Sequence, residues 1–294
     1  MVRTALIVVM LTLPWMCLMA LAPADPTISP TIVSAAPLRF RLYDGYAIVV
    51  QVPAGDTRKT YNLMIDTGAN PSVIDSQAAA DLGLSGRKLR LALVNGTIAT
   101  RLAELPPFTF GPIQHEPLRV LIRDLSFIRP QLGIRIDGIL GMDVLAAQNL
   151  TIDYQHGELR FGTPAESAAN TADFTSGPPF VTVTVNIDGQ PLQMLVDTGN
   201  QGTLLFRTRT QQRLKNTRVL GDARGVNMAG RLSVEKLRLR QLRLGKTTLR
   251  NPPATLLDDN TQWGGAFDGL LGPAGLKLKR LSFDFEHRKL YWDR

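Results

Sequence analysis

Runs in which apolar and polar residues alternate recur along most of the chain, and this period of two is typical of strands with one buried face. Residues 181–187 place Val, Val, Val and Ile at every second position, with Thr, Thr and Asn between them. Asp188-Gly189 then predicts a tight hairpin turn before the apolar run "LQMLV". Residues 46–52 and 61–65 repeat the pattern around a longer polar turn. The sequence therefore predicts a mainly β protein.

Helical patterns are few and short. Within residues 75–84 a helix is expected to begin after a cap at Asp75 and to stop at Gly83, and residues 141–148 are the other candidate. Residues 89–102 instead predict a hairpin, in which Asn95-Gly96 supplies the positive φ angles of a type I′ turn.

A repeat organises the chain. The motif "MIDTGAN", which ends at Asn70, is answered by "LVDTGNQ", which ends at Gln201, and two further motif pairs follow in the same order. In each pair the equivalent aspartates lie 131 positions apart. Three motifs in constant register indicate a duplicated unit. The equivalent aspartates are Asp66 and Asp197, Asp137 and Asp268, and Asp153 and Asp284.

The repeat and the composition divide the 294 residues into two lobes and their connections. A small, polar stretch that bears Pro and Gly lies between the two copies, and such stretches are typical of linkers. We expect an export segment at 1–24, a Pro-rich linker at 25–37, a first lobe at 38–162, a linker at 163–179 and a second lobe at 180–294.

The N-terminus predicts export to the periplasm or the extracellular space. Arg3 precedes an apolar run over residues 5–22, and small residues lead to an expected signal-peptide cut after Ala24. The run is also just long enough to span a bilayer, so retention as an N-terminal anchor is the alternative to cleavage. Cys17 is the only cysteine, so no intramolecular disulfide forms.

An acidic residue, a hydroxyl and a glycine stand directly behind an apolar run at Asp66-Thr67-Gly68 and again at Asp197-Thr198-Gly199. A lone copy is an ordinary turn after a strand. Two copies at equivalent points of a repeat predict that a pseudo-two-fold axis brings both carboxyls together where the lobes meet. Two carboxyls that close share one proton, and their pKa values split. The ionised carboxyl then accepts a proton from water while the protonated carboxyl donates to a carbonyl.

The neighbouring residues have supporting roles in this interpretation. Gly68 and Gly199 let the backbone approach the carboxyls and donate amide hydrogen bonds to them. Thr67 and Thr198 are expected to direct their hydroxyls into the backbone of the opposite lobe, which fixes the separation of the pair. Such a pair requires no metal, cofactor or nucleophilic side chain, and the sequence predicts none.

Over residues 40–292 the chain resembles the pepsin and retropepsin superfamily of aspartic proteases, most closely bacterial retropepsin-like domains present twice in one chain. The resemblance rests on the two Asp-Thr-Gly motifs and on the later motifs "DGILG" at 137–141 and "DGLLG" at 268–272. It implies two acid-protease barrel lobes, related by a pseudo-two-fold axis and paired within the chain. It also implies that Asp66 and Asp197 are catalytic and that an extended peptide or protein is the substrate.

The resemblance further implies hairpin flaps that close over the peptide. The candidate tips are Asn95-Gly96 in lobe 1 and Met228 and Gly230 in lobe 2, and neither hairpin carries the flap tyrosine of pepsin-like enzymes. Pepsin-like enzymes follow Asp-Thr-Gly with Ser or Thr, whose hydroxyl bonds the aspartate, whereas this chain has Ala69 and Asn200. The Asn200 amide is expected either to donate similarly or to move the pKa values of the pair off their optimum.

Other recurrent polar residues are expected to be structural. Asp137 and Asp268 are placed at strand-to-helix turns, and His156 and His287 in the turn of the hairpin that ends each lobe. His115 is isolated in a Pro-flanked loop, so histidine spacing offers no metal cluster. The tryptophans in the two lobes are expected in the core or at a lobe edge rather than in a peptide cleft; they are Trp263 and Trp292.

The net charge of +8 is concentrated in residues 207–250, which hold 13 Lys or Arg against 2 Asp or Glu. Within them, residues 237–244 mostly alternate apolar with basic residues, so the charge is interpreted as the solvated face of strands. A surface for anionic lipids or polymers is the alternative. No nucleic-acid module is present in the sequence, and membrane attachment is expected only through residues 5–22.

The leading hypothesis is an exported aspartic endopeptidase that hydrolyses peptide bonds through Asp66 and Asp197. The alternative is a non-catalytic peptide-binding or scaffold protein that retains the fold, and both Asn200 and the unequal charge of the two lobes favour it.

Overall fold

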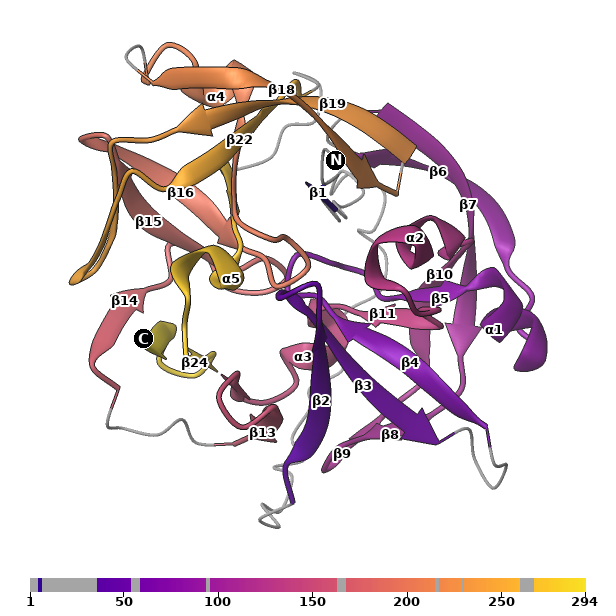
Figure 1. Ribbon diagram of the computed structural model, residues 1–294. Coiled ribbons are helices and arrows are strands. Elements are labelled where there is room, and N and C mark those ends of the chain that lie inside the picture. The colour runs from indigo at the N-terminus through magenta and orange to yellow at the C-terminus, as the bar shows by residue number, and fades with distance from the viewer. Residues whose placement is uncertain are drawn as a thin grey trace.

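The computed structural model describes residues 5–6, 36–53, 59–93, 96–162, 168–214, 217–228, 230–259 and 267–294. The expected export segment (apart from the backbone of 5–6), nearly all of the Pro-rich linker, the Asn95 turn residue and Trp263 lie outside this range. The described residues are mainly β with few short helices, as predicted, and Figure 1 shows them gathered in two lobes. None of their helices is long and apolar enough to cross a bilayer.

Lobe 1 is built around three strands that lie side by side. In this group β11 (Gly138–Leu140) is the central strand. It runs parallel to β4 (Thr60–Ile65) on one side and antiparallel to β5 (Val73–Asp75) on the other. The strands of the lobe-1 sheet are β2 (Leu38–Tyr43), β3 (Ala47–Pro53), β4 (Thr60–Ile65), β5 (Val73–Asp75), β6 (Arg87–Leu93), β7 (Gly96–Leu105), β10 (Leu118–Arg123) and β11 (Gly138–Leu140). A small separate hairpin consists of β8 (Phe108–Phe110) and β9 (Ile113–His115).

Lobe 2 repeats the same arrangement, with β23 (Gly269–Leu271) parallel to β16 (Gln190–Val196) and antiparallel to β17 (Thr203–Phe206). The predicted hairpin turn at Asp188-Gly189 is confirmed, because both residues have positive φ, 51° and 89°. The strands of this lobe are β15 (Thr182–Ile187), β16 (Gln190–Val196), β17 (Thr203–Phe206), β18 (Arg218–Asn227), β19 (Gly230–Arg238), β20 (Gln241–Leu244), β21 (Thr247–Arg250), β22 (Pro253–Leu257) and β23 (Gly269–Leu271).

The helices are single turns or little more. Both predicted helices are confirmed, and Asp75 caps the first by accepting a hydrogen bond of 3.0 Å from the Gln77 amide. The helices are α1 (Ser76–Asp81), α2 (Arg129–Leu132), α3 (Met142–Leu145), α4 (Arg207–Thr210) and α5 (Pro273–Leu276), with a 3-10 turn η2 (Ser126–Ile128) before α2.

A shared layer of strands joins the lobes. Strand β12 (Leu150–Asp153) of lobe 1 pairs antiparallel with β24 (Arg280–Asp284) of lobe 2, and Thr151 lies opposite Ser282. The Thr151 hydroxyl donates to the Ser282 hydroxyl at 2.9 Å, and these residues are 131 positions apart. Equivalent residues of the two copies thus touch each other, which places the pseudo-two-fold axis between them.

Two further strands extend this layer, because β13 (Glu158–Phe161) pairs with β12 and β25 (Lys289–Asp293) pairs with β24. Strand β14 (Asn170–Asp173) then pairs with β25. Residues 163–179 were expected to be a linker, but residues 170–173 form this edge strand. Trp292 on β25 is fully buried, and its indole donates to the Thr247 hydroxyl at 2.9 Å. Its predicted core position is therefore confirmed.

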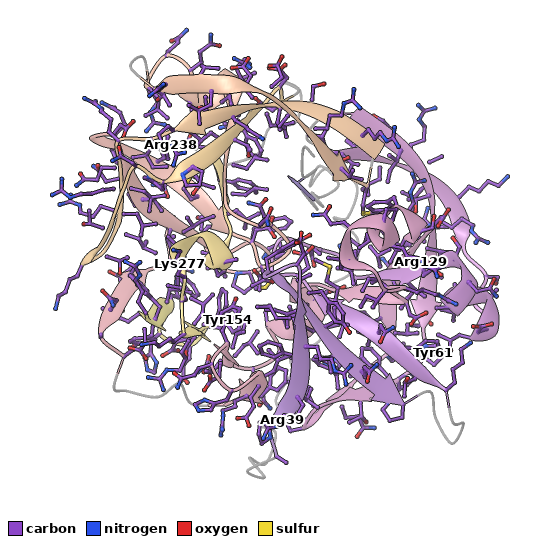
Figure 2. All side chains as sticks on the ribbon, viewed as in Figure 1. Arg39, Tyr61, Arg129, Tyr154, Arg238 and Lys277 are labelled. Carbon is purple, nitrogen blue, oxygen red and sulfur yellow. The ribbon has the colours of Figure 1, made fainter. Side chains whose placement is uncertain are left out.

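The basic stretch of lobe 2 follows the strands as expected, with one difference. The leucines of residues 237–244 are buried and the arginines between them are exposed, and Figure 2 labels Arg238 among the side chains of lobe 2. The stretch is not one strand, however, because it is divided between β19 and β20 at Leu239-Arg240. The backbone turns there. The Leu239 amide donates to the Pro252 carbonyl at 3.1 Å, and the Asn251 amide donates to the Arg240 carbonyl at 3.0 Å.

The hairpin β18–β19 reaches across to lobe 1 (Figure 1). Strand β18 has 10 residues, against 7 in its lobe-1 equivalent β6. The tip residue Met228 is 1% exposed and packs in a lobe-1 hydrophobic cluster that includes Tyr46 and Leu93. Arg123 of lobe 1 donates to the Met228 carbonyl at 3.1 Å and to the Ala99 carbonyl at 3.0 Å. One side chain therefore connects this tip to the β6–β7 hairpin.

Candidate active site

Asp66 and Asp197 stand at the ends of the equivalent strands β4 and β16. The amide of Asp66 donates to the Leu140 carbonyl at 3.0 Å, and the amide of Asp197 donates to the Leu271 carbonyl at 3.1 Å. Strands β11 and β23 therefore fix the two loops in the same way. The side chains are 0% and 1% exposed, so both carboxyls are withdrawn from bulk solvent.

Two threonines cross-connect the lobes directly beneath these carboxyls. The Thr67 hydroxyl donates to the Val196 carbonyl at 2.7 Å, and the Thr198 hydroxyl donates to the Ile65 carbonyl at 2.9 Å. Each hydroxyl also accepts the other threonine's amide, at 3.0 and 3.1 Å. These four buried hydrogen bonds obey the pseudo-two-fold axis and set the distance between β4 and β16.

The glycines let each carboxyl lie against the backbone of the opposite lobe. A Cβ atom on Gly68 would lie 2.5 Å from Cγ of Asp197, and one on Gly199 would lie 2.5 Å from Oδ2 of Asp66. Each glycine amide also donates to the aspartate two residues earlier, at 2.8 Å. Any larger residue at these positions would push the carboxyls apart.

Burial and mutual repulsion shift the protonation of this pair. Removal from water raises the pKa of Asp66 to about 6, against the lowering effect of hydrogen bonds from the two glycine amides and from Asp197. The pKa of Asp197 is raised further, first by burial and then by the Asp66 charge and their mutual hydrogen bond. Both pKa values are therefore raised, and two neighbouring buried carboxyls of this kind share one proton between their two titrations.

The residues after the glycines do not reach the carboxyls with their side chains. Ala69 is fully buried and has no donor. The Asn200 side chain donates to the Gly202 carbonyl at 2.6 Å, so the expectation that its amide replaces the usual hydroxyl is not met. The Asn200 backbone amide instead lowers the pKa of Asp197 slightly. One carboxyl oxygen of each aspartate, Oδ2, has no donor among the described residues.

Comparison with protein-family models now decides the family. A model described as aspartyl protease matches residues 50–144 and 183–273, one copy in each lobe. The chain belongs to the aspartyl protease family. The two matched segments contain both Asp-Thr-Gly motifs, and the family supports a protease-like function in general. A search among curated proteins gave no match.

Tyr46 adds a group to this aspartyl protease site that sequence reasoning missed. It lies in the turn between β2 and β3, is 2% exposed, and has no hydrogen-bond partner for its hydroxyl among the described residues. Burial raises its pKa first, and the charges of Asp44, Asp66 and Asp197 raise it further. The hydroxyl is therefore close enough to the carboxyl pair to sense its charge.

The second motif of each lobe is structural. The Asp137 carboxylate accepts the Asn62 amide at 2.8 Å and the Arg135 guanidinium at 2.9 Å. Asp268 accepts the Gln193 amide at 2.8 Å and Arg213 at 3.0 Å. Both aspartates directly precede the strands β11 and β23 and tie neighbouring strands together, rather than standing at strand-to-helix turns as expected.

The histidines also have structural positions. His156 and His287 bond Asp153 and Asp284 through Nδ1, at 2.8 and 2.9 Å, in equivalent turns, which confirms the turn-forming role predicted for them. His115 ends strand β9 instead of lying in a loop, and its ring stacks on Phe108 with centroids 4.8 Å apart. Among the described residues, no cluster of three or more His, Cys, Asp or Glu side chains is placed to hold a metal ion.

A cleft of about 650 Å³ lies between lobe 1 and the β18–β19 hairpin. Its lobe-1 wall includes the β2–β3 turn and α2, and Gln201, four residues after Asp197, also lines it. Of the residues at the tips of the two hairpins, Gly230 lines this cleft, Met228 is buried in lobe 1, and Gly96 starts β7 opposite Leu93. The cleft lining comprises Asp44, Phe127, Pro130, Gln131, Gln201, Arg224, Gly225, Val226, Gly230 and Arg231.

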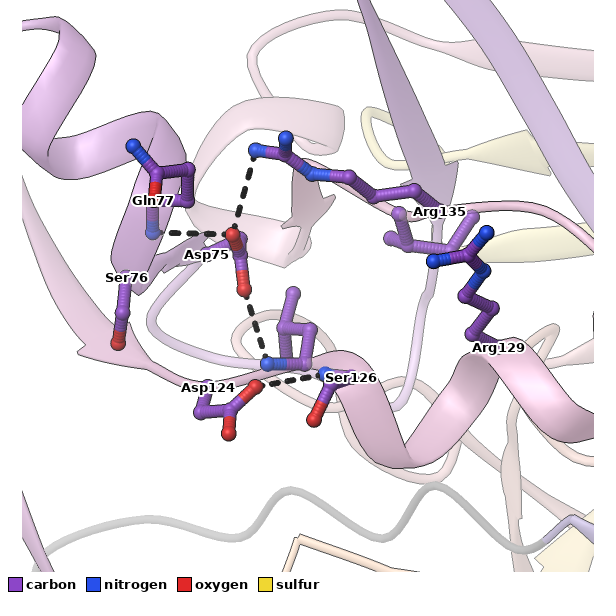
Figure 3. Close-up of a pocket in the computed structure, with 9 residues that line it drawn as sticks. Asp75, Ser76, Gln77, Asp124, Ser126, Arg129 and Arg135 are labelled. Atoms are coloured by element: carbon purple, nitrogen blue, oxygen red, sulfur yellow. Dashed lines mark hydrogen bonds and ion pairs between the residues drawn. The ribbon is translucent and has the colours of Figure 1, made fainter.

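A second cavity, of about 340 Å³, lies in lobe 1 between α1 and η2 (Figure 3). Its central carboxylate, Asp75, accepts the Gln77 and Leu125 amides, each at 3.0 Å, and Arg135 approaches it at 3.4 Å. Asp124 in turn accepts the Ser126 amide at 2.8 Å. Asp75 therefore connects β5 to the loop before α2.

Proposed function

We propose that the protein is an exported aspartic endopeptidase, in which Asp66 and Asp197 activate a water molecule to hydrolyse peptide bonds. The observation that carries this proposal is the contrast between two kinds of buried aspartate. Asp137 and Asp268 have their carboxylates occupied by amide and guanidinium donors. Asp66 and Asp197 are more deeply buried, yet each has one oxygen that accepts no hydrogen bond from the part of the chain that the structure describes. Such a costly arrangement is typical of a catalytic site.

The pKa directions supply the roles. Asp66, the member of lower pKa, is ionised first and accepts a proton from water as the water oxygen attacks the substrate carbonyl carbon. Asp197 retains the shared proton and gives it to the carbonyl oxygen. The resulting tetrahedral diol collapses when Asp66 returns its proton to the amide nitrogen, which leaves as an amine, and a diol hydroxyl returns a proton to Asp197. The pair ends the cycle with one proton, as it began.

The surrounding elements support binding of an extended chain. The β18–β19 hairpin forms one wall of the cleft and acts as a flap in this proposal, with its tip held by Arg123 and the lobe-1 cluster. The Tyr46 hydroxyl, which has no partner among the described residues, is a candidate donor to a substrate or a water at the pair. Export rests on the signal-like pattern of residues 1–24.

The experiment compares cleavage of a denatured protein by wild type, Asp66→Asn and Asp197→Asn. Each single change is expected to reduce turnover by at least 10³-fold, because proton sharing requires both carboxyls. Asp124→Asn is the matched control, since Asp124 is an exposed aspartate that caps Ser126. A statine-type inhibitor, which mimics the tetrahedral diol, should block wild type. If both single variants keep wild-type activity, the proposal is wrong; peptide binding without any cleavage by wild type would favour a scaffold instead.

A further inference from the structure

The cleft between lobe 1 and the β18–β19 hairpin has walls of opposite charge. The hairpin wall carries Arg224 and Arg231, and both side chains are exposed. Neither guanidinium forms an ion pair within the described residues. The lobe-1 wall carries one carboxylate, Asp44, which accepts the Gln131 amide at 3.1 Å. The two arginines are therefore free to meet a ligand.

The strand register places both arginines on one face of the hairpin. Arg224 lies opposite Ser233, and Val226 lies opposite Arg231. Arg224 and Arg231 are thus diagonal neighbours across the two strands, about 7–8 Å apart at the backbone. Residues of the other face, such as Ala223 and Leu232, are buried in lobe 2. Two like charges this close, neither of them in an ion pair with a described residue, favour an anion beside them.

The edge of β18 is also shown to accept an extended chain. Strand β18 would be the edge of the lobe-2 sheet, but the backbone of β1 (Ala5–Leu6) pairs parallel to it, with Ala5 opposite Gly225 and Leu6 opposite Val226 (Figure 1). In paired strands, residues that lie opposite each other point to the same face. A peptide on this edge therefore places one side chain beside Arg224.

We propose that the Arg224–Arg231 wall selects peptides with an acidic side chain at the position opposite Arg224, so that the enzyme prefers Asp or Glu near the bond it cleaves. This inference rests on the proposed function and adds the substrate class. The peptide backbone takes the place of β1 beside β18, and its acidic side chain lies on the same face as the two guanidinium groups, nearest to Arg224. The substrate residue that contacts the lobe-1 wall faces Asp44. A basic side chain is therefore tolerated at that substrate position, and an acidic one is not.

The experiment profiles cleavage of a peptide library by the full chain and then measures matched peptides that differ only by Glu or Gln at the enriched position. Wild type is expected to prefer Glu by about three- to tenfold in kcat/KM, since two exposed ion pairs contribute modestly and are screened. Arg224→Gln and Arg231→Gln should each reduce the preference. Arg224→Glu combined with Arg231→Glu should reverse it in favour of Lys. Arg243→Gln, an exposed arginine on β20 outside the cleft, should change nothing.

A binding measurement separates this inference from the proposed function. Fluorescence anisotropy of the labelled Glu and Gln peptides with the Asp66→Asn variant reports selection without turnover. Tighter binding of the Glu peptide, lost in Asp66→Asn combined with Arg224→Gln and Arg231→Gln and weakened by 0.5 M salt, supports the arginine wall even if wild type cleaves nothing. Equal binding of both peptides, or a Glu preference that survives loss of both arginines, overturns it.

Discussion

The threonine pair between the lobes provides the sharpest test of how the carboxyls are held. In Thr67→Val a methyl group replaces a hydroxyl that donates to the Val196 carbonyl at 2.7 Å and accepts the Thr198 amide at 3.1 Å. The side chain keeps its size, so the change removes hydrogen bonds and little else. Two buried backbone groups are left without partners.

The magnitude follows from those two groups. A buried backbone donor or acceptor without a partner costs about 1–3 kcal/mol, so Thr67→Val should lower the free energy of unfolding by about 2–6 kcal/mol. If the lobes separate slightly to admit water, the loss is smaller but the carboxyls move. A displacement near 1 Å costs about 100-fold in rate. The variant is therefore expected to lose stability, activity or both.

Urea unfolding followed by the fluorescence of the buried Trp292, together with kcat/KM on a cleaved peptide, measures both quantities. Thr67→Ser keeps the hydroxyl and should lose only about 1 kcal/mol for the methyl group. Thr151→Val removes the Thr151–Ser282 contact between the lobes and should leave kcat unchanged, because Thr151 forms no hydrogen bond with the strands that carry the carboxyls. A Thr67→Val protein within about 0.5 kcal/mol and twofold of wild type, inside the usual range for a neutral surface change, would refute the reasoning.

Four further predictions concern the carboxyl pair, Tyr46 and the tip of the β18–β19 hairpin. The rate kcat/KM should fall as pH drops below about 6, because Asp66 is then protonated, and a pH–rate profile measures this limb. Both carboxyls have folded-state pKa values above the unfolded value of 3.8, so the folded state binds more protons than the unfolded state. The free energy of unfolding should therefore decrease as pH rises from about 4 through 6. Urea titrations at each pH measure this slope, and Asp66→Asn should flatten it. Tyr46→Phe should leave the free energy of unfolding equal or higher, because the buried hydroxyl has no partner among the described residues. The same change should lower kcat, and an unchanged kcat would exclude a role of the hydroxyl at the site. Met228→Ser should release the hairpin tip from the lobe-1 cluster, so that the amides of β18 and β19 exchange faster and KM rises. Exchange rates equal to wild type would show that other contacts hold the tip.

The repeat explains why much of the site could be predicted from the sequence. Equal spacing of three motifs required equivalent positions in two lobes, and the lobes then place Asp66 and Asp197 on one axis. The alternation of residues 181–187 predicted β15 correctly because its buried face is apolar at every second residue. Strand β14 was missed because an edge strand of sequence "NTAD" needs no apolar face.

Features that depend on tertiary distance could not be predicted. Tyr46 precedes Asp66 by 20 residues, and only the turn between β2 and β3 brings its hydroxyl near the pair. Arg123 has no motif, and its role depends on where the β18–β19 hairpin ends. The Asn200 amide was expected to donate to the aspartate or to move the pKa values of the pair. It donates instead to the Gly202 carbonyl, because a side-chain bond two residues along the same turn costs little chain ordering.

The pairing of β12 with β24 also determines what each lobe requires from the other. These strands are copies of one another, and Thr151 and Ser282 meet at their centre. A lobe made alone would expose this strand as an open edge that fits a second, identical lobe. Its folding would then depend on protein concentration, as in an obligate dimer. Joining the copies in one chain replaces that dependence with a fixed, roughly millimolar effective concentration. It also frees each half to diverge, as the arginines on one wall of the cleft and the aspartate on the other illustrate.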